Sequence, residues 1–287
     1  MKKFDLQDKV ILITGASGGI GKAVAERLYE CGAKLVLTDL SLGALNTTFA
    51  EMDKNRVFIA TLDVVNMAET KAVVAEAIKQ FGRIDVAFAN AGIGAKTPTT
   101  MLAIADDEFQ QIVNVDLFGV WNTIKATLPH IIDAQGHILI TASIYAFVNG
   151  MANAPYAASK AAVESLGRAL RTELAGTGAT AGVLYPGWVA TPIANVAFGG
   201  HREATALVKH AMPGPFGRAV QPVVIADAVI AGVQSRASRI IVPKRWIPMS
   251  LLRGLLNATS DALLDRDRKV HQLIRALEKR VAGNQQD

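Results

Sequence analysis

A glycine-rich turn that directly follows a short apolar run constrains the fold of this chain more than any other feature. Residues 10–13 read Val-Ile-Leu-Ile between polar neighbours, which is typical of a buried parallel strand. The next eight residues read TGASGGIG, and residues 23–31 have a helical pattern. In this order, glycines let the backbone approach a ligand, and the helix N-terminus offers free N–H groups. We therefore predict a phosphate-binding turn at Gly15, Gly19 and Gly21, with a purely structural turn as the alternative.

An acidic residue ends the second predicted strand, residues 34–38. Asp39 lies 18 residues beyond Gly21, where a carboxylate can accept hydrogen bonds from the hydroxyls of an adenosine ribose. The same charge would repel a 2′-phosphate, and neither Leu40 nor Ser17 supplies a cation to hold one. NAD(H) is therefore expected in preference to NADP(H), unless Asp39 is only a solvated strand end.

Strand and helix patterns continue to alternate along the chain. Residues 42–53, 67–80 and 106–132 have helical spacing, and residues 57–60 and 84–88 have strand character. The fourth strand runs into ANAG at 89–92, whose small residues leave room for a ring system at the carboxyl edge of a sheet.

Tyr156 and Lys160 open an alanine-rich helical segment that follows another apolar strand, residues 138–142. Residues four apart lie on the same helix face, so the phenol and the ammonium would point into the same space. A nearby cation lowers the pKa of a phenol, which would make Tyr156 a general acid/base near neutral pH. Ser143, at the end of the strand, could offer its hydroxyl to the same oxygen. A chance surface pair is the alternative.

Composition excludes several classes of protein. The chain of 287 residues suits one large α/β domain or two small ones, and 51% of it is hydrophobic. Cys31 is the only cysteine, so no internal disulfide can form. We expect a soluble cytoplasmic protein because no apolar leader or span of about 20 residues is present. There is no metal-ligand spacing of His and Cys, and no basic stripe interleaved with aromatics, so neither metal nor nucleic acid is expected.

The motifs together resemble those of the short-chain dehydrogenases/reductases. They are TGASGGIG at 14–21, ANAG at 89–92, Asn114, Ser143, YAASK at 156–160 and PGWVATP at 186–192, in that order. The resemblance covers roughly residues 6–243. It implies an α/β fold: a single Rossmann-type, doubly wound domain with a seven-stranded parallel sheet.

The resemblance also implies roles for individual residues. Tyr156 would be the catalytic acid/base, Ser143 would orient the substrate oxygen, and Asn114 would hold a water in a proton relay to Lys160. The cofactor-binding residues would be Gly15, Ser17, Gly19, Ile20, Gly21, Asp39, Leu40, Asp63, Val64, Asn90, Ala91, Gly92, Tyr156, Lys160, Pro186, Gly187, Val189 and Thr191.

These roles imply an oxidoreductase that interconverts an alcohol and its ketone with NAD(H). Two alternatives remain: a 3-oxoacyl-thioester reductase, which uses the same site, and a non-catalytic dinucleotide-binding or redox-sensing protein. By resemblance we also expect a homodimer or homotetramer.

The substrate loop is expected at about residues 191–220. Its glycines and prolines suggest hinges, and its aromatic and methionine side chains suggest an apolar lining. That lining favours a hydrophobic secondary alcohol or ketone, including a steroid-like or lipid-like one; ordinary core packing is the alternative for the same residues. The predicted pocket residues are Tyr145, Met151, Trp188, Phe198, Met212 and Phe216.

A helical extension, residues 244–287, follows the predicted catalytic domain, residues 1–243. It carries nine Lys/Arg and five Asp/Glu, so it accounts for most of the net charge of +5. Leucines at helical spacing between residues 248 and 264, and apolar residues between 270 and 281, predict two amphipathic helices. We expect them to pack within or between subunits, in preference to the alternative of contact with a membrane surface.

Overall fold

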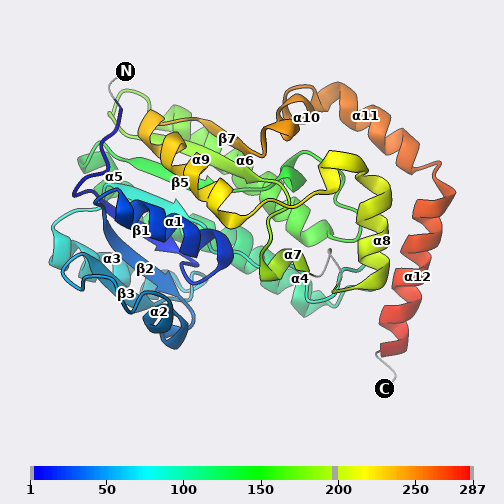
Figure 1. Cartoon of the computed structure of the whole chain (residues 1–287), viewed down its shortest axis with the longest axis horizontal. Helices are drawn as coiled ribbons and strands as arrows, with labels where there is room; N and C mark the ends of the chain where they lie inside the picture. Colours follow the sequence, from blue (N-terminus) through cyan, green and yellow to red (C-terminus); the bar gives the residue numbers. More distant parts are fainter. Residues whose placement is uncertain (1–2, 196–199, 285–287) are drawn as a thin grey trace.

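The computed structural model describes residues 3–195 and 200–284, and its strands form one parallel sheet (Figure 1). Within the described residues the strand order is β3-β2-β1-β4-β5-β6-β7. The chain runs outward from β1 in one direction and then restarts at β4 in the other. The carboxyl edge beside β1 and β4 is therefore the position where doubly wound sheets bind ligands. The strands are β1 (Val10–Thr14), β2 (Lys34–Asp39), β3 (Val57–Thr61), β4 (Val86–Ala89), β5 (His137–Thr141), β6 (Thr180–Pro186) and β7 (Arg239–Val242).

Helices cover both faces of the sheet, and each face has its own apolar core. Successive residues of a strand point to opposite faces. Ile11 and Ile13 of β1 accordingly pack in the core beneath α1 and α9, whereas Val10 and Leu12 pack in the core beneath α3, α5 and α6. The helices flanking the sheet are α1 (Gly19–Glu30), α2 (Leu42–Thr48), α3 (Met67–Phe81), α4 (Asp106–Val113), α5 (Val120–Asp133), α6 (Ala154–Glu173) and α9 (Pro222–Ser235).

The seven-stranded, doubly wound α/β fold expected from the resemblance is confirmed, with two local differences. The helix predicted over residues 42–53 ends at Thr48. The long helix predicted over 106–132 is interrupted by a wider π-helical segment, η1 (Asn114–Gly119), between α4 and α5. Such segments shift the side chains that follow them and are frequent at functional sites.

The substrate-loop region and the extension form the other end of the molecule (Figure 1). Helix α8 lies side by side with α12, whose outer surface faces away from the sheet. No helix in the described part of the chain is long and apolar enough to cross a membrane. The remaining elements are η2 (Ile144–Ala146), α7 (Pro192–Asn195), α8 (Arg202–Ala211), η4 (Gly214–Gly217), η5 (Lys244–Trp246), α10 (Ile247–Leu251), α11 (Arg253–Leu264) and α12 (Arg268–Asn284).

Candidate active site

The glycine turn after β1 forms a tight cradle at the N-terminus of α1. Gly15 has φ +65°, and a Cβ atom there would lie 2.9 Å from the Ala91 Cα atom. A Cβ atom on Gly19 would lie 2.6 Å from a methyl group of Thr191. The N-cap residue, Gly18, makes no side-chain hydrogen bond, so no side chain caps the first N–H groups of the helix. Such an uncapped helix start behind an open glycine turn fits a phosphate group.

Asp39 closes the adjacent edge of this cradle. Its Oδ2 atom accepts hydrogen bonds from the Ser17 N–H group at 3.0 Å and from the Ser17 hydroxyl at 2.6 Å. Its Oδ1 atom accepts one from the Leu40 N–H group at 2.8 Å. These bonds hold the carboxylate at the end of β2 with its charge beside the glycine turn.

Asn90 is anchored below the same turn. Its backbone N–H group donates to the Thr14 hydroxyl at 3.0 Å, and its side-chain amide donates to the Thr14 carbonyl at 3.1 Å. The Asn90 side-chain oxygen accepts from the Thr141 hydroxyl at 3.3 Å. Strands β1, β4 and β5 are thereby tied together where they end, which fixes the floor of the site.

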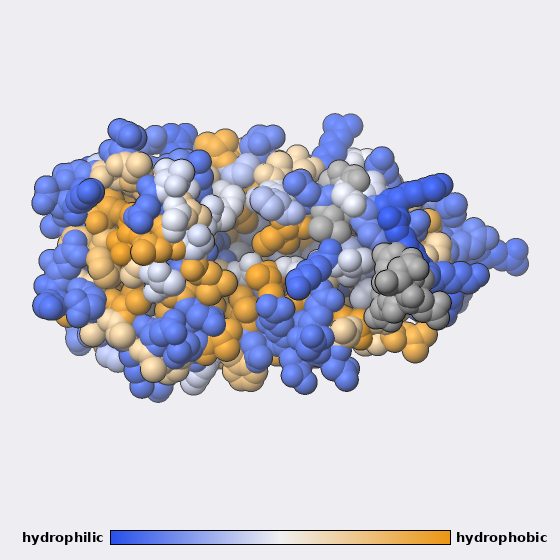
Figure 2. Space-filling model, turned by 90° about the horizontal axis from the view of Figure 1, so that it is seen from below, coloured by the Kyte–Doolittle hydropathy of each residue, from blue (hydrophilic) through white to orange (hydrophobic). Residues whose placement is uncertain are grey.

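One cavity of about 480 Å³ joins the glycine turn to the predicted catalytic residues. Figure 2 shows a hollow near the middle of the face seen from below, with hydrophobic residues at its border. The volume lies in the range of small-molecule sites. All the predicted cofactor residues line this cavity, from Gly15 to Thr191, and so do Ser143, Tyr156 and Lys160.

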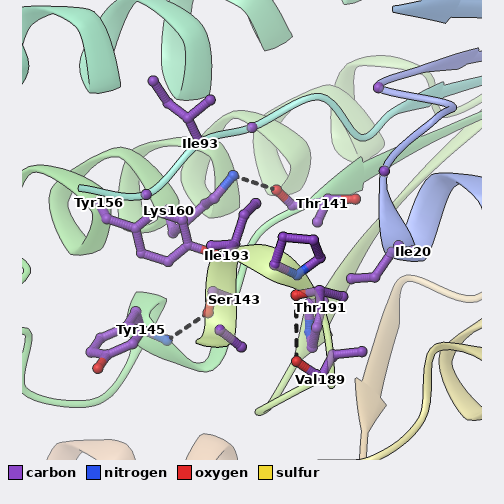
Figure 3. Close-up of a pocket in the computed structure, with 18 of the residues that line it drawn as sticks. Ile20, Ile93, Thr141, Ser143, Tyr145, Tyr156, Lys160, Val189, Thr191 and Ile193 are labelled. Atoms are coloured by element: carbon purple, nitrogen blue, oxygen red, sulfur yellow. Dashed lines mark hydrogen bonds between the residues drawn. The ribbon is translucent and has the colours of Figure 1, made fainter. Parts of the chain in front are cut away.

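Tyr156 projects from α6 toward Ser143, which follows β5, whereas the Lys160 side chain extends from the same helix toward Thr141 (Figure 3). The Lys160 Nζ atom lies 5.2 Å from the centroid of the Tyr156 ring and donates a hydrogen bond to the Thr141 carbonyl at 3.3 Å. The Tyr145 ring meets the Tyr156 ring edge-on at 5.9 Å. The Lys160 side chain is almost completely buried.

The pKa of Tyr156 is raised above its ordinary value, opposite to the sequence-based expectation. Burial is the largest cause; Lys160 acts to lower the pKa, but Asp116 raises it, and the hydrogen bond from Ser143 lowers it. The predicted effect of the lysine is therefore present but outweighed. The spacing of Tyr156 and Lys160 could not show the carboxylate that opposes it.

Asp116 is a buried carboxylate beside this cavity that the sequence analysis missed. Its Oδ2 atom lies 3.1 Å from the Lys160 Nζ atom, and both side chains are buried. Its Oδ1 atom accepts a hydrogen bond from the Ile93 N–H group at 2.7 Å. Asn114, which was expected to act in a relay to Lys160, is exposed and is not among the described residues that line the cavity.

A sequence signal could have found Asp116. It stands four residues after Ile112 and four before Val120, and those two apolar residues are buried. Residues four apart share a helix face, so Asp116 lies on the buried face and Asn114 on another.

The predicted substrate residues divide into two groups. Tyr145, Met151 and Trp188 line the cavity. Met212 and Phe216 are not among its described lining residues; Phe216 instead packs against Trp246 with ring centroids 5.0 Å apart. Phe198 lies outside the described residues. Apolar lining residues that the sequence analysis did not name include Ile93, Pro98, Ile144, Ile193, Leu207 and Val208.

A doubly wound sheet with a glycine cradle and a Ser-Tyr-Lys set at its carboxyl edge is the arrangement expected of a dinucleotide-dependent oxidoreductase. A sequence model described as short chain dehydrogenase matches residues 9–199. An uncharacterized oxidoreductase of Listeria monocytogenes is 37% identical over 193 residues, which cover 66% of this chain and 77% of the relative. The chain belongs to the short-chain dehydrogenase/reductase family.

Solved structures agree with this assignment. A short chain dehydrogenase/reductase from Burkholderia phymatum in complex with NAD has a TM-score of 0.76 and 26% identity, covering 92% of this chain and 97% of that one. A 3-ketoacyl-(acyl-carrier-protein) reductase from Brucella melitensis complexed with NADH has a TM-score of 0.74 and 29% identity, covering 83% and 97%.

Proposed function

We propose that this protein is an NAD(H)-dependent oxidoreductase that interconverts a hydrophobic secondary alcohol and its ketone. The observation that carries the proposal is the convergence of Tyr156, Lys160 and Ser143 on the cavity that also contains the glycine cradle. A bound nicotinamide supplies the hydride chemistry, and the residues of this chain supply position and a proton.

The side chains of the site fit the proton step of carbonyl reduction. The Ser143 hydroxyl would hold the substrate oxygen next to the Tyr156 phenol. Tyr156 would donate its proton to that oxygen as the carbonyl carbon is reduced, and would take it back in the oxidation direction. Lys160 would stabilise the phenolate that remains, because its ammonium lies over the ring.

The preference for NAD(H) over NADP(H) is part of the proposal. Asp39 presents its charge beside the glycine turn, and Lys160 is the one Lys or Arg among the described residues of the cavity. A 2′-phosphate near Asp39 would therefore meet a negative charge without a compensating cation.

The proposed substrate class rests on the apolar wall of the cavity. Apolar and aromatic side chains, among them Ile144, Tyr145, Trp188 and Leu207, line it. Among the described lining residues, Asp39, Asp63 and Lys160 are the only Asp, Glu, Lys, Arg or His side chains. This lining suits a neutral hydrophobic ketone better than a phosphate ester or a carboxylate.

A second candidate is reduction of a 3-oxoacyl thioester. The similar Brucella melitensis structure complexed with NADH supports it, because that protein is a 3-ketoacyl-(acyl-carrier-protein) reductase. The Ser-Tyr-Lys set argues against a purely non-catalytic binding protein, since a binding site for a dinucleotide needs no proton donor.

The accessory features are also proposals. We propose that residues 1–243 form the catalytic unit and residues 244–287 an accessory extension. Members of the family are commonly oligomeric, and we propose a homodimer or homotetramer for this chain.

A screen by NADH fluorescence tests the proposed function. Wild-type protein and Tyr156→Phe are compared on hydrophobic ketones, diketones, hydroxysteroids and 3-oxoacyl thioesters. We expect turnover of neutral ketones by the wild type, loss of at least about a thousandfold in kcat for the variant, and similar NADH affinity for both. Retained turnover in Tyr156→Phe would refute the acid/base assignment, and turnover of thioesters alone would favour the second candidate.

A further inference from the structure

The active-site lysine is paired with a buried carboxylate. Asp116 Oδ2 lies 3.1 Å from Lys160 Nζ, and the exposed fractions of the two side chains are 0% and 2%. Removing two opposite charges from water is costly unless they compensate each other closely. A contact this close and this buried therefore couples the charge of Lys160 to that of Asp116.

The surrounding backbone is shaped to hold this pair. The Ile93 N–H group donates to Asp116 Oδ1 at 2.7 Å, and the Thr141 carbonyl accepts from Lys160 at 3.3 Å. A Cβ atom on Gly92 would lie 3.1 Å from Lys160 Nζ and 3.3 Å from Asp116 Oδ1, so a glycine leaves the space that the pair fills. The π-helical segment η1 begins two residues before Asp116.

We infer that Asp116 is a positioning residue that holds the Lys160 ammonium and weakens its attraction for the Tyr156 phenolate, so that the phenol stays protonated through the neutral range. A protonated phenol is ready to donate to a carbonyl oxygen. The site is therefore set for ketone reduction near neutral pH, and oxidation of the alcohol requires more alkaline conditions. This inference rests on the proposed function.

Three elements contribute the titratable and polar groups around the Tyr156 phenol proton. Helix α6 contributes Tyr156 and Lys160, and η1 contributes Asp116. The segment after β5 contributes Ser143 and Tyr145, whose ring packs against that of Tyr156. Among these, burial and Asp116 raise the pKa of the phenol, whereas Lys160 and Ser143 lower it.

The pKa of the Lys160 ammonium is also raised. Burial acts to lower the pKa of Lys160, but Asp116 and Tyr156 raise it, and the net direction is upward. Burial also raises the pKa of the Asp116 carboxyl, against the effects of Lys160 and the Ile93 N–H group. The decisive question is therefore whether Asp116 carries its charge, because a neutral Asp116 would leave the field of Lys160 unopposed.

Titration of the phenol answers this question without cofactor or substrate. The protein is labelled with ¹³C at the phenol carbon of tyrosine, and Tyr156→Phe assigns the Tyr156 resonance. Wild type is compared with Asp116→Asn, which removes the charge at nearly constant shape. Asp107→Asn is the matched control, because Asp107 is an exposed carboxylate on the preceding helix α4.

We expect Asp116→Asn to lower the Tyr156 midpoint by about one pH unit or more, and Asp107→Asn to leave it unchanged. In the kinetics, the acidic limb of kcat/KM for alcohol oxidation should move down by the same amount. An unchanged midpoint in Asp116→Asn would show that Asp116 is neutral and would overturn the inference.

Two further readouts separate the inference from the proposed function. If Asp116→Asn does not fold, the wild type alone decides, because a Tyr156 midpoint below about 9 contradicts the inference. If no alcohol or ketone is turned over, the proposed function fails while the titration remains valid. If turnover is found but the midpoint does not move, only the role of Asp116 is wrong.

Discussion

Glu164 and Arg253 form an ion pair that connects the extension to helix α6, which carries Tyr156 and Lys160. One Arg253 nitrogen lies 2.9 Å and 2.8 Å from the two carboxylate oxygens of Glu164. Glu164 is buried and stands four residues after Lys160 on the same helix. The contact therefore connects α11 to the element that carries the proposed acid/base.

Removing Arg253 is expected to destabilise the fold. In Arg253→Met, the cationic partner that remains for the buried Glu164 carboxylate among the described residues is Arg239, at 3.5 Å. Because Arg253 is partly exposed, we expect a loss of about 1–3 kcal/mol in the free energy of unfolding, below the value for a fully buried pair. Urea unfolding followed by circular dichroism measures it.

A double-mutant cycle provides the control. Adding Glu164→Gln to Arg253→Met removes the stranded charge and should recover part of the lost stability. If the two substitutions are simply additive, the pair does not couple α11 to α6.

The extension also holds the helix that borders the substrate end of the cavity. Arg280 of α12 contacts Glu203 at 2.7 Å, and His210 contacts Asp267 at 2.7 Å, so both ends of α8 are tied to the extension. Between these ends, Leu207 of α8 lines the cavity. Loosening α8 should therefore affect substrate binding more than the proton step.

For Arg280→Gln combined with Asp267→Asn we expect a rise of about two- to fivefold in KM for a ketone, with kcat nearly unchanged, because partly exposed pairs contribute below about 1 kcal/mol each. Steady-state kinetics measures this. Arg275→Gln is the matched control, because its ion pair with Glu278 lies within α12. Equal KM changes in the control and the double variant would show that the effect is not transmitted through α8.

The sequence analysis could predict the features of the site that depend on neighbouring residues in the chain. The glycine cradle and the Tyr156/Lys160 pair depend on short spacings, and local backbone geometry carries these directly into the structure. The helical spacing could have placed Asp116 on a buried face, but not beside Lys160, because that contact joins residues 44 positions apart in the chain. The contact between Phe216 and Trp246 could not be predicted from a short motif, because the two residues stand 30 positions apart in the chain. The raised pKa of Tyr156 depends on burial, which no short motif contains.

Asp39 is expected to determine the choice of cofactor. In Asp39→Ala, loss of the ribose hydrogen bonds should weaken NADH binding by about tenfold or more, whereas NADPH binding should improve because the repulsion is removed. Adding Leu40→Arg should favour NADPH further, since the Leu40 side chain is 69% exposed and free to be replaced. Fluorescence titration measures both affinities.

Leu40→Ala alone is the control and should leave the preference unchanged. A wild-type protein that already binds NADPH more tightly than NADH would contradict the assignment of Asp39.

His137 should make the fold sensitive to acid. It is fully buried in β5, with Nδ1 2.9 Å from the Thr180 hydroxyl. Burial, together with Arg236 and Arg171, lowers its pKa to about 3. Because the unfolded state takes up the proton first, near about pH 6.5, this stabilisation is complete above that value and is lost as the pH falls toward 3.

From about pH 7 to 4.5, the wild type should lose about 3 kcal/mol more stability than His137→Asn. Urea unfolding at the two pH values measures the difference. His130→Gln, on α5, is the control and should follow the wild type. Identical pH dependence in the wild type and His137→Asn would show that His137 is not held neutral.

The proposed oligomer is expected to form through α5 rather than through the extension. Phe118 of η1 and Trp121 of α5 are 51% and 44% exposed and stand three residues apart, so they form part of one exposed face. Large exposed aromatic side chains of this kind are enriched at subunit interfaces. A charge placed there would be buried without a partner on association, so Trp121→Glu should shift the protein to monomers in light scattering coupled to gel filtration.

Leu263→Glu, at a 70% exposed position on α11, tests the other surface and should leave the assembly intact. Dissociation by Leu263→Glu but not by Trp121→Glu would place the interface on the extension, and a monomeric wild type would refute the oligomer altogether.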